Sequence, residues 1–240
     1  MKRLLVLLFS IFLVSCTSSL KTPVRQSADL IKHMGGSTVA LVINENGYTH
    51  VYCSGVWISE THILTAGHCM AGLARHIKGK DEGEVDPVGV KVHYIIEREV
   101  TDVGEEPTAI HLAKVEKWNE DKDLALVKAF GKTIPYHNHA ELVKEMPALG
   151  ESVFIVGHPK GLYWSYINGV VSSYRSELSF GPLSNYGPFV QISAPVWFGN
   201  SGGGAFDGNG DLVGIASFIT RAPNTSFFVH PDNIKNFLKE

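Results

Sequence analysis

Short hydrophobic runs, each bounded by turn-forming residues, follow one another along most of the chain from Thr38 onward. The runs are rich in Val, Ile and aromatic residues and are only a few residues long, which is typical of β-strands. They are TVALVI, YTHVYCSGVWIS, HILTAGHC, GVKVHYIIER, DLALVKA, ESVFIVGH, WSYINGVVSSY, FVQISAP and DLVGIASFIT. Asn46-Gly47, between the first two runs, is a hairpin signal. The pattern predicts an all-β protein with antiparallel strands, arranged as a sandwich or as barrels.

Segments without this pattern lie near the middle and towards both ends. His137–Gly150 lacks strand alternation, which predicts a connection between two β halves. Asp232–Glu240 is expected to form a short closing helix, with Asp232 as its capping residue after Pro231. Asp29–Met34 is compatible with another short helix.

The first residues have the architecture of an export signal. Lys2 and Arg3 precede a hydrophobic stretch, Leu4–Val14, which is too short to span a bilayer. The stretch runs into Ser15-Cys16, and this end resembles the bacterial lipobox, in which a Cys receives lipid and becomes the first residue after cleavage. We expect a lipoprotein signal peptide over residues 1–15 and lipidation of Cys16. An ordinary secretory signal and an uncleaved anchor are the alternatives.

Residues 16–37 are rich in Ser, Thr, Gly and Lys, which suits a tether between a lipid and a folded domain. The domain is therefore expected in the cell envelope, bound to the membrane through lipid on Cys16 and facing the periplasm or the exterior. Thr17 stands where an Asp commonly retains lipoproteins at the inner membrane, so the outer membrane is favoured.

Composition narrows the class of protein. The chain has 240 residues, enough for one large all-β domain, and 44% of them are hydrophobic against 19% charged, which excludes disordered and collagen-like chains. The 21 Lys and Arg against 24 Asp and Glu give a net charge of -3, and no basic run follows the export signal. Nucleic acid is therefore not an expected partner.

Three cysteines occur in the sequence. If Cys16 is lipidated, Cys53 and Cys69 remain as a pair in an oxidising compartment, where a disulfide is the natural outcome. Such a bridge closes a loop of about 16 residues and stabilises a fold by about 3 kcal/mol. Two buried free thiols are the alternative. Metal binding by this pair is poorly supported, because a closed zinc site needs four ligands.

Three segments together contain a base, an acid and a nucleophile. They are Leu64–Cys69 (LTAGHC), Asp121–Leu126 (DKDLAL) and Gly199–Gly203 (GNSGG). A serine hydroxyl becomes nucleophilic when an imidazole takes its proton, and a carboxylate must orient that imidazole. Glycines on both sides of a serine let backbone N–H groups approach a developing oxyanion. The combination indicates nucleophilic catalysis.

The same segments resemble the motifs of the chymotrypsin-like serine proteases. TAGHC matches the histidine motif, DLAL the aspartate motif and GNSGG the nucleophile motif, in the order of that family. The resemblance covers about Thr38 to Pro231 and is closest to the compact bacterial branch that includes the Deg-type periplasmic proteases. It implies two six-stranded β-barrels, over about 38–130 and 150–231, joined by a connection over about 131–149. It also implies a disulfide between Cys53 and Cys69.

The resemblance implies a role for each motif residue. His68 becomes the general base and acid, Asp123 its orienting carboxylate and Ser201 the nucleophile, while Gly199 and Ser201 supply the oxyanion-hole N–H groups. The expected reaction is hydrolysis of a protein or peptide substrate through an acyl-enzyme, with no cofactor.

Asp121 competes with Asp123 for the role of the acid. We prefer Asp123 because the apolar residues Leu124–Leu126 follow it directly and place it at the start of a buried strand. Asp121 precedes the charged Lys122 and is expected to face solvent.

Asn200 departs from the pancreatic members of the family, which carry an Asp there to bind the amino terminus released by zymogen cleavage. An amide cannot form that ion pair, so no tryptic activation is expected. The resemblance also places Pro195 near the base of the specificity pocket, which argues against a preference for Lys or Arg. Ser217, Phe218 and Ile219 correspond to the strand that pairs with substrate backbone, and the bulk of Ile219 suggests that a small apolar side chain is accepted.

Other readings remain open. A lipid-tethered binding protein on a protease scaffold and an esterase with the same triad are the alternative functions. His137 and His139 lie two residues apart, but two histidines with this spacing are more often part of a solvated loop than of a metal site, so we assign no metal. Trp197 and Phe198 are either core aromatics or a rim of the active-site cleft.

Overall fold

The structure is a computed structural model that describes residues 23–79, 83, 85–96, 109–130, 138–178 and 187–240. The expected signal peptide and the lipidation site Cys16 lie outside these residues, as does His137. In the described part, no helix is both long enough and apolar enough to cross a membrane.

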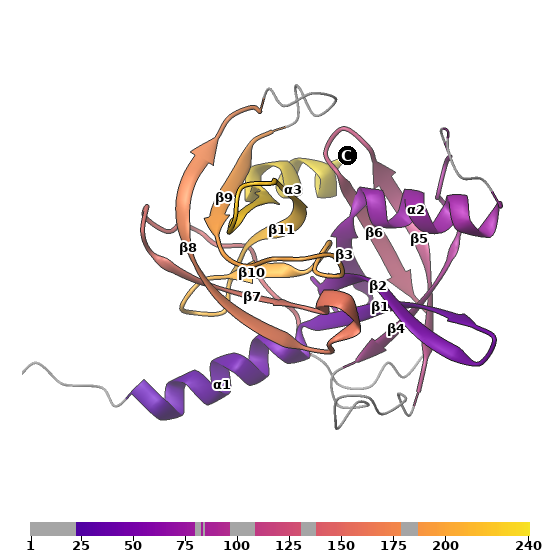
Figure 1. Cartoon of the computed structure of the whole chain (residues 1–240), viewed down its shortest axis with the longest axis horizontal. Coiled ribbons are helices and arrows are strands. Elements are labelled where there is room, and N and C mark those ends of the chain that lie inside the picture. Colours follow the sequence, from indigo (N-terminus) through magenta and orange to yellow (C-terminus); the bar gives the residue numbers. More distant parts are fainter. Residues whose placement is uncertain (1–22, 80–82, 84, 97–108, 131–137, 179–186) are drawn as a thin grey trace, which may run out of the picture.

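Two closed antiparallel barrels make up the body of the molecule (Figure 1). The first has the strand order β1-β2-β3-β6-β5-β4 and the second β10-β11-β12-β9-β8-β7. The first barrel consists of β1 (Thr38–Glu45), β2 (Tyr48–Trp57), β3 (His62–Ala66), β4 (Lys91–Ile96), β5 (His111–Asn119) and β6 (Leu124–Ala129). The second consists of β7 (Ser152–Gly157), β8 (Ser165–Arg175), β9 (Phe189–Ser193), β10 (Gly204–Phe206), β11 (Leu212–Ile219) and β12 (Thr225–Val229). The fold is chymotrypsin-like, which confirms the predicted class.

Side chains that point inward at alternate strand positions fill the interior of each barrel. In β4 every second residue at the start of the strand is buried, and the first barrel closes around large side chains such as Trp57 and Tyr94. The second barrel is filled by smaller aliphatic residues such as Val153, Ile155 and Ile192. A further cluster, which includes Val56, Leu64 and Val156, draws on both barrels and joins them.

Within the described residues, three α-helices and one 3-10 turn accompany the barrels. They are α1 (Pro23–Gly36), α2 (Gly67–Ile77), η2 (Pro159–Gly161) and α3 (Pro231–Lys239). Helix α1 is longer than the short helix expected around Asp29–Met34. Helix α2 was not expected, because HILTAGHC reads as a single run, whereas the strand in it ends at Ala66.

The cap of α3 differs from the prediction. His230, not Asp232, is the N-cap residue, and its ring nitrogen accepts a hydrogen bond from the Asp232 N–H group. Pro231 occupies the first helical position, where its missing N–H group costs no hydrogen bond. The cap therefore lies two residues earlier than the sequence suggested.

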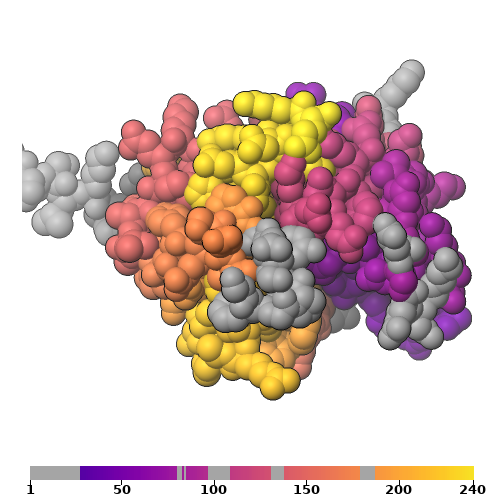
Figure 2. Space-filling model, turned by 90° about the horizontal axis from the view of Figure 1, so that it is seen from above, coloured from indigo at the N-terminus to yellow at the C-terminus, as the bar shows by residue number. Residues whose placement is uncertain are grey.

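Helix α3 links the two barrels. Its buried residues Ile234 and Phe237 pack into the shared cluster, and the Lys117 ammonium from β5 donates a hydrogen bond to the Phe237 carbonyl. Lys122 also pairs with Glu240. In Figure 2 the C-terminal residues, in yellow, lie against pink residues of the first barrel.

Candidate active site

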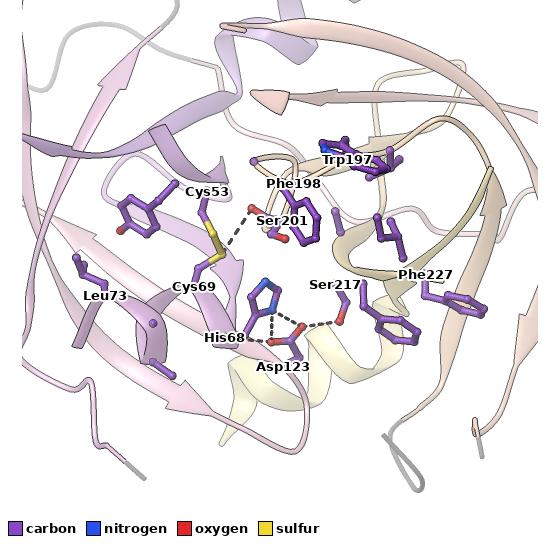
Figure 3. Close-up of a pocket in the computed structure, with 18 of the residues that line it drawn as sticks. Cys53, His68, Cys69, Leu73, Asp123, Trp197, Phe198, Ser201, Ser217 and Phe227 are labelled. Carbon is purple, nitrogen blue, oxygen red and sulfur yellow. Dashed lines mark hydrogen bonds and ion pairs between the residues drawn. A yellow bond between two sulfur atoms is a disulfide. The ribbon is translucent and has the colours of Figure 1, made fainter. Parts of the chain in front are cut away.

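A cleft of about 750 Å³ contains residues from both barrels. Its first-barrel wall includes His68, Cys69 and Asp123, and its second-barrel wall includes Gly199 and Ser201. Figure 3 shows the His68 ring between Ser201 and Asp123. The three residues that the sequence singled out for catalysis thus face one cleft.

Strand pairing brings His68 and Asp123 together. β3 pairs with β6 so that Ala66 lies opposite Leu124, and the two residues stand just beyond this pair, one on each chain segment. Gly67 permits the close approach, because a Cβ atom there would lie 2.9 Å from the Leu124 nitrogen.

The Asp123 carboxylate accepts hydrogen bonds from three groups. His68 Nδ1 lies 3.0 Å from both carboxylate oxygens, and the His68 backbone N–H donates to Oδ1 at 2.8 Å. The Ser217 hydroxyl donates to Oδ2. These bonds leave His68 Nδ1 as a donor to the carboxylate, so the neutral ring presents an unprotonated Nε2 to the cleft. Asp121, the competing acid, is exposed and makes none of these contacts.

The pKa of His68 is raised above its ordinary value of 6.5. Removal of water by the cleft walls acts to lower this pKa, and the nearby Arg75 charge lowers it slightly further. The negative charge of Asp123 and its hydrogen bond outweigh both effects. The ring is therefore tuned as a stronger base than a free imidazole.

Ser201 stands in the turn before β10 and is partly buried. Among the described residues its hydroxyl makes no hydrogen bond to the His68 ring. Such catalytic hydrogen bonds are often long before substrate binds, so this geometry is compatible with a nucleophile and base.

Two residues that line the same cleft carry backbone N–H groups without an acceptor among the described residues. Within the described part of the chain, the N–H groups of Gly199 and Ser201 have no acceptor. The Phe198 carbonyl accepts a hydrogen bond from the Lys160 N–H at 2.9 Å, and because the C=O and N–H of a trans peptide point in opposite directions, the Gly199 N–H faces away from Lys160. Such free donors suit a developing oxyanion.

Glycine is required at two positions of this turn. Gly199 has a φ of 100°, a backbone angle that residues with a side chain rarely adopt. Gly202 has a φ of 82°, and a Cβ atom there would lie 2.1 Å from the Thr65 hydroxyl oxygen. The GNSGG pattern thus follows from backbone conformation and close packing.

The residues predicted to bind substrate fall into two groups. Ser217, Phe218 and Ile219 line the cleft, whereas Pro195 is not among its lining residues. The Ser217 hydroxyl donates a hydrogen bond to Asp123, a contact that the sequence motifs did not predict. Trp197 and Phe198 are 48% and 69% exposed, so they form a rim of the cleft rather than part of the core.

Three potential metal ligands converge in the described residues, namely Cys53, His68 and Cys69. Cys53 and Cys69 form a disulfide, so neither sulfur carries the thiolate that a metal requires. The His68 ring nitrogen Nδ1 is already paired with Asp123. This cluster is therefore unsuited to holding a metal ion.

A second histidine and serine lie in contact behind the cleft. Ser54 Oγ is 2.8 Å from His158 Nδ1, and both residues are fully buried. Burial lowers the pKa of His158 to about 3, so its ring is neutral at physiological pH. Neither residue lines the cleft, so the pair cannot touch a substrate there. No local sequence pattern marks this pair.

Known proteins resemble parts of this chain in sequence. The family model described as "Trypsin-like peptidase domain" matches residues 53–215, more than half of the chain. A probable periplasmic serine endoprotease, DegP-like, of Pseudomonas putida (strain W619) is 38% identical over 97 residues, 40% of this chain and 19% of that protein. The corresponding protein of Hahella chejuensis is 31% identical over 167 residues, 69% of this chain and 29% of that protein.

The fold has solved counterparts. The HtrA-type protease AlgW, solved with a tripeptide, superposes with a TM-score of 0.65 at 19% identity, covering 88% of this chain and 61% of that one. At this identity the likeness concerns the fold alone. The chain spans less than a third of the length of the two DegP-like relatives described above.

Proposed function

Because this chain belongs to the trypsin-like peptidase domain family and is related to DegP/HtrA-type serine proteases, we propose that it is a serine endopeptidase that cleaves proteins or peptides. The observation that carries the proposal is the cleft that contains the hydrogen-bonded pair His68 and Asp123, the hydroxyl of Ser201, and two backbone N–H groups without an acceptor. No cofactor is required for this chemistry.

The reaction proceeds through an acyl-enzyme. The Ser201 hydroxyl attacks the scissile carbonyl while His68 Nε2 takes its proton, and Asp123 stabilises the resulting imidazolium. The N–H groups of Gly199 and Ser201 donate to the oxyanion of the tetrahedral intermediate. His68 then protonates the leaving amine, and water, deprotonated by His68, hydrolyses the ester formed on Ser201.

The lining of the cleft supports an apolar preference. The second-barrel wall of the cleft carries Phe189, Val196, Phe218, Ile219 and Phe227, and its described lining residues include no Asp or Glu that could form an ion pair with a cationic side chain. We propose that a small apolar side chain precedes the scissile bond. Cleavage of a peptide library is the test, and a preference for Lys or Arg would contradict the proposal.

The turn at Asn200 supports activity without a cleaved amino terminus. The Asn200 amide is fully buried, and its Nδ2 donates to the Trp197 carbonyl at 3.1 Å within the turn itself. A neutral side chain held in this way needs no ionic partner. Mature protein that remains inert until it is cut near Thr38 would contradict this part of the proposal.

The Ser201→Ala variant tests the proposed activity. We expect turnover of a peptide substrate to fall on the order of a million-fold, with an unchanged melting temperature. A fluorophosphonate should label Ser201 of the parent protein and leave the variant unlabelled. Absence of labelling in a folded parent protein would refute the proposed enzymatic activity and favour a binding function. Hydrolysis of small esters without peptide cleavage would favour an esterase.

We also propose that the protein is exported and anchored through lipid on Cys16. The lipobox-like end of the first segment supports this, and the DegP-like relatives are named as periplasmic. Mass spectrometry of the membrane fraction should find a lipid-modified Cys16 as the first residue. The Cys16→Ser variant should stay unmodified, and an unmodified parent protein would contradict the anchor.

A further inference from the structure

Ser54 connects the first barrel to both residues that carry the free N–H groups. Its backbone N–H donates to the Ser201 carbonyl at 2.8 Å, and its hydroxyl donates to the Gly199 carbonyl at 2.7 Å. Its own carbonyl accepts a hydrogen bond from the Thr65 hydroxyl at 2.7 Å. Ser54 is itself fully buried, in the buried second half of β2. One residue of the first barrel thus holds two residues of the second.

The direction of these hydrogen bonds determines which ring nitrogen of His158 carries the proton. A hydroxyl has one proton, and Ser54 gives it to the Gly199 carbonyl, which can only accept. His158 Nδ1, 2.8 Å from Ser54 Oγ, must therefore be the donor of that contact. His158 is then the Nδ1–H tautomer, and its bare Nε2 is the buried atom that has no partner among the described residues.

Aromatic packing holds the His158 ring in place. The Trp164 ring lies edge-on to it with centroids 4.7 Å apart, and Tyr163 packs beside it at 6.2 Å. The histidine is fully buried, so water does not compete for Nδ1. The chain of hydrogen bonds from His158 through Ser54 to Gly199 is therefore built on a rigid base.

We propose that Ser54 and His158 are positioning residues that keep the oxyanion hole in its donor-inward conformation. Gly199 has no side chain to restrict rotation of its peptides, and its φ of 100° shows that it uses this freedom. The Ser54 hydroxyl holds the peptide that follows Gly199, as Lys160 holds the one before it. Without the Ser54 hydroxyl, the peptide that follows Gly199 keeps only the hydrogen bond from the Asn200 N–H to the Trp197 carbonyl, so Gly199 and its N–H group are held less firmly. This inference rests on the proposed function.

The Ser54→Ala variant tests the role of the hydroxyl. It keeps the backbone bond to Ser201 and removes the one to Gly199, so we expect kcat to fall about 100-fold while KM changes less than about two-fold. A peptide boronate, whose adduct places an oxygen in the oxyanion hole, should lose affinity by a similar factor. Binding of the cleaved product peptide should not change.

Ser37→Ala is the matched control. Ser37 is also fully buried, and its hydroxyl donates to a backbone carbonyl, that of His33, at 2.8 Å. Its loss should leave kcat unchanged. If Ser54→Ala keeps a kcat within about two-fold of the control, the hydroxyl does not position the oxyanion hole.

Two variants of His158 give an independent answer, also if Ser54→Ala fails to fold. His158→Leu removes the donor and should lower kcat about 10-fold. His158→Asn places an amide N–H near the position of Nδ1 and should recover most of that loss. Equal kcat values for the two variants would overturn the proposed role of His158.

The ring tautomer can be measured without any activity. Nitrogen-15 NMR of His158 should show a protonated Nδ1 and a bare Nε2 between pH 5 and pH 8. A protonated Nε2 in this range would overturn the proposal. If a fluorophosphonate does not label the folded parent protein, the proposed function fails. The NMR measurement of the tautomer still tests whether the hydrogen bonds run from His158 through Ser54 to Gly199.

Discussion

Asp123 is the residue on which the geometry of the base depends. Its carboxylate is held by the His68 ring, the His68 backbone and the Ser217 hydroxyl, and only the first of these contacts acts on the imidazole directly. The other two fix the carboxylate so that it can fix the ring.

Asp123→Asn should therefore disable catalysis without unfolding the protein. The amide can offer its N–H to His68 and stabilise the wrong tautomer, so we expect kcat to fall about 10⁴-fold. Asp121→Asn is the matched control, because Asp121 is exposed two residues away. Steady-state kinetics on both variants decide between the two acids, and a larger loss in the control would reverse the assignment.

The pH dependence of the reaction follows from the raised pKa of His68. The ring must be neutral to accept the Ser201 proton, so activity should rise with pH through a midpoint above 6.5. In Asp123→Asn the loss of the negative charge should move the midpoint to lower pH. Profiles of kcat/KM against pH measure the midpoints of the parent protein and of the variant. A midpoint below pH 6.5 in the parent protein would contradict the prediction.

His158 should make stability depend on pH. Its pKa is about 3 when folded against 6.5 for an exposed ring, so below pH 6.5 the unfolded chain binds the additional proton. The free energy of unfolding should then fall by up to about 1.4 kcal/mol per pH unit as pH decreases from 6.5 towards 3.

Urea unfolding at pH 7.5 and pH 5 gives this slope. His158→Asn, which does not titrate, should have a shallower slope than the parent protein by the His158 contribution. Equal slopes in the two proteins would show that the buried ring does not carry this effect.

At the scale of elements, the disulfide joins β2 to α2 and encloses β3. It links Cys53 to Cys69, directly after His68, across a sequence separation of 16 residues. The Cys53→Ala/Cys69→Ala double variant should lower the free energy of unfolding by about 3 kcal/mol. Chemical denaturation measures this, with Cys16→Ser as the control. A loss as large in the control would contradict the assignment.

Sequence patterns identified most strands but not all. The expected runs correspond to nine of the strands and omit β5, β10 and β12. β10 has only three residues, too few for a pattern. In β5, exposed charged residues alternate with the buried Ala113 and Val115, so the strand contains no continuous hydrophobic run. Helix α2 begins at Gly67 with no side-chain cap on Ala66, so no local signal marks its start. Its position depends on the disulfide and on packing against the barrel.

The motifs predicted the residues of the cleft better than the contacts behind them. His68, Asp123 and Ser201 are recognisable because each lies in a local pattern. Ser54 and His158 lie 104 residues apart and meet only when the barrels pack together. Ser217 and Asp123 are separated by 94 residues. Contacts of this kind carry no local signal.

At the scale of the whole molecule, the site exists only while the two barrels are packed against each other in this arrangement. Ser54 and Asp123, both from the first barrel, reach across to Gly199 and Ser217 of the second. On the same junction, Phe237 of α3 packs in the shared core, and the Lys117 ammonium lies 4.7 Å from the centre of its ring.

Phe237→Ala should therefore weaken the whole molecule. Phe237 is fully buried, and we expect a loss of about 3 to 5 kcal/mol in the free energy of unfolding. Leu238→Ala is the control, since Leu238 is 38% exposed. Urea denaturation of both variants checks this, and similar losses would show that the helix does not anchor through Phe237.

The division of the site between barrels also sets the order in which it is made. A ribosome produces His68 and Asp123 first and Ser201 only after three of the six strands of the second barrel, and the other three strands follow Ser201. An N-terminal unit that folds early carries no complete catalytic apparatus. On the proposed function, a chain that has not yet completed its second barrel therefore cannot cleave itself or a neighbouring chain.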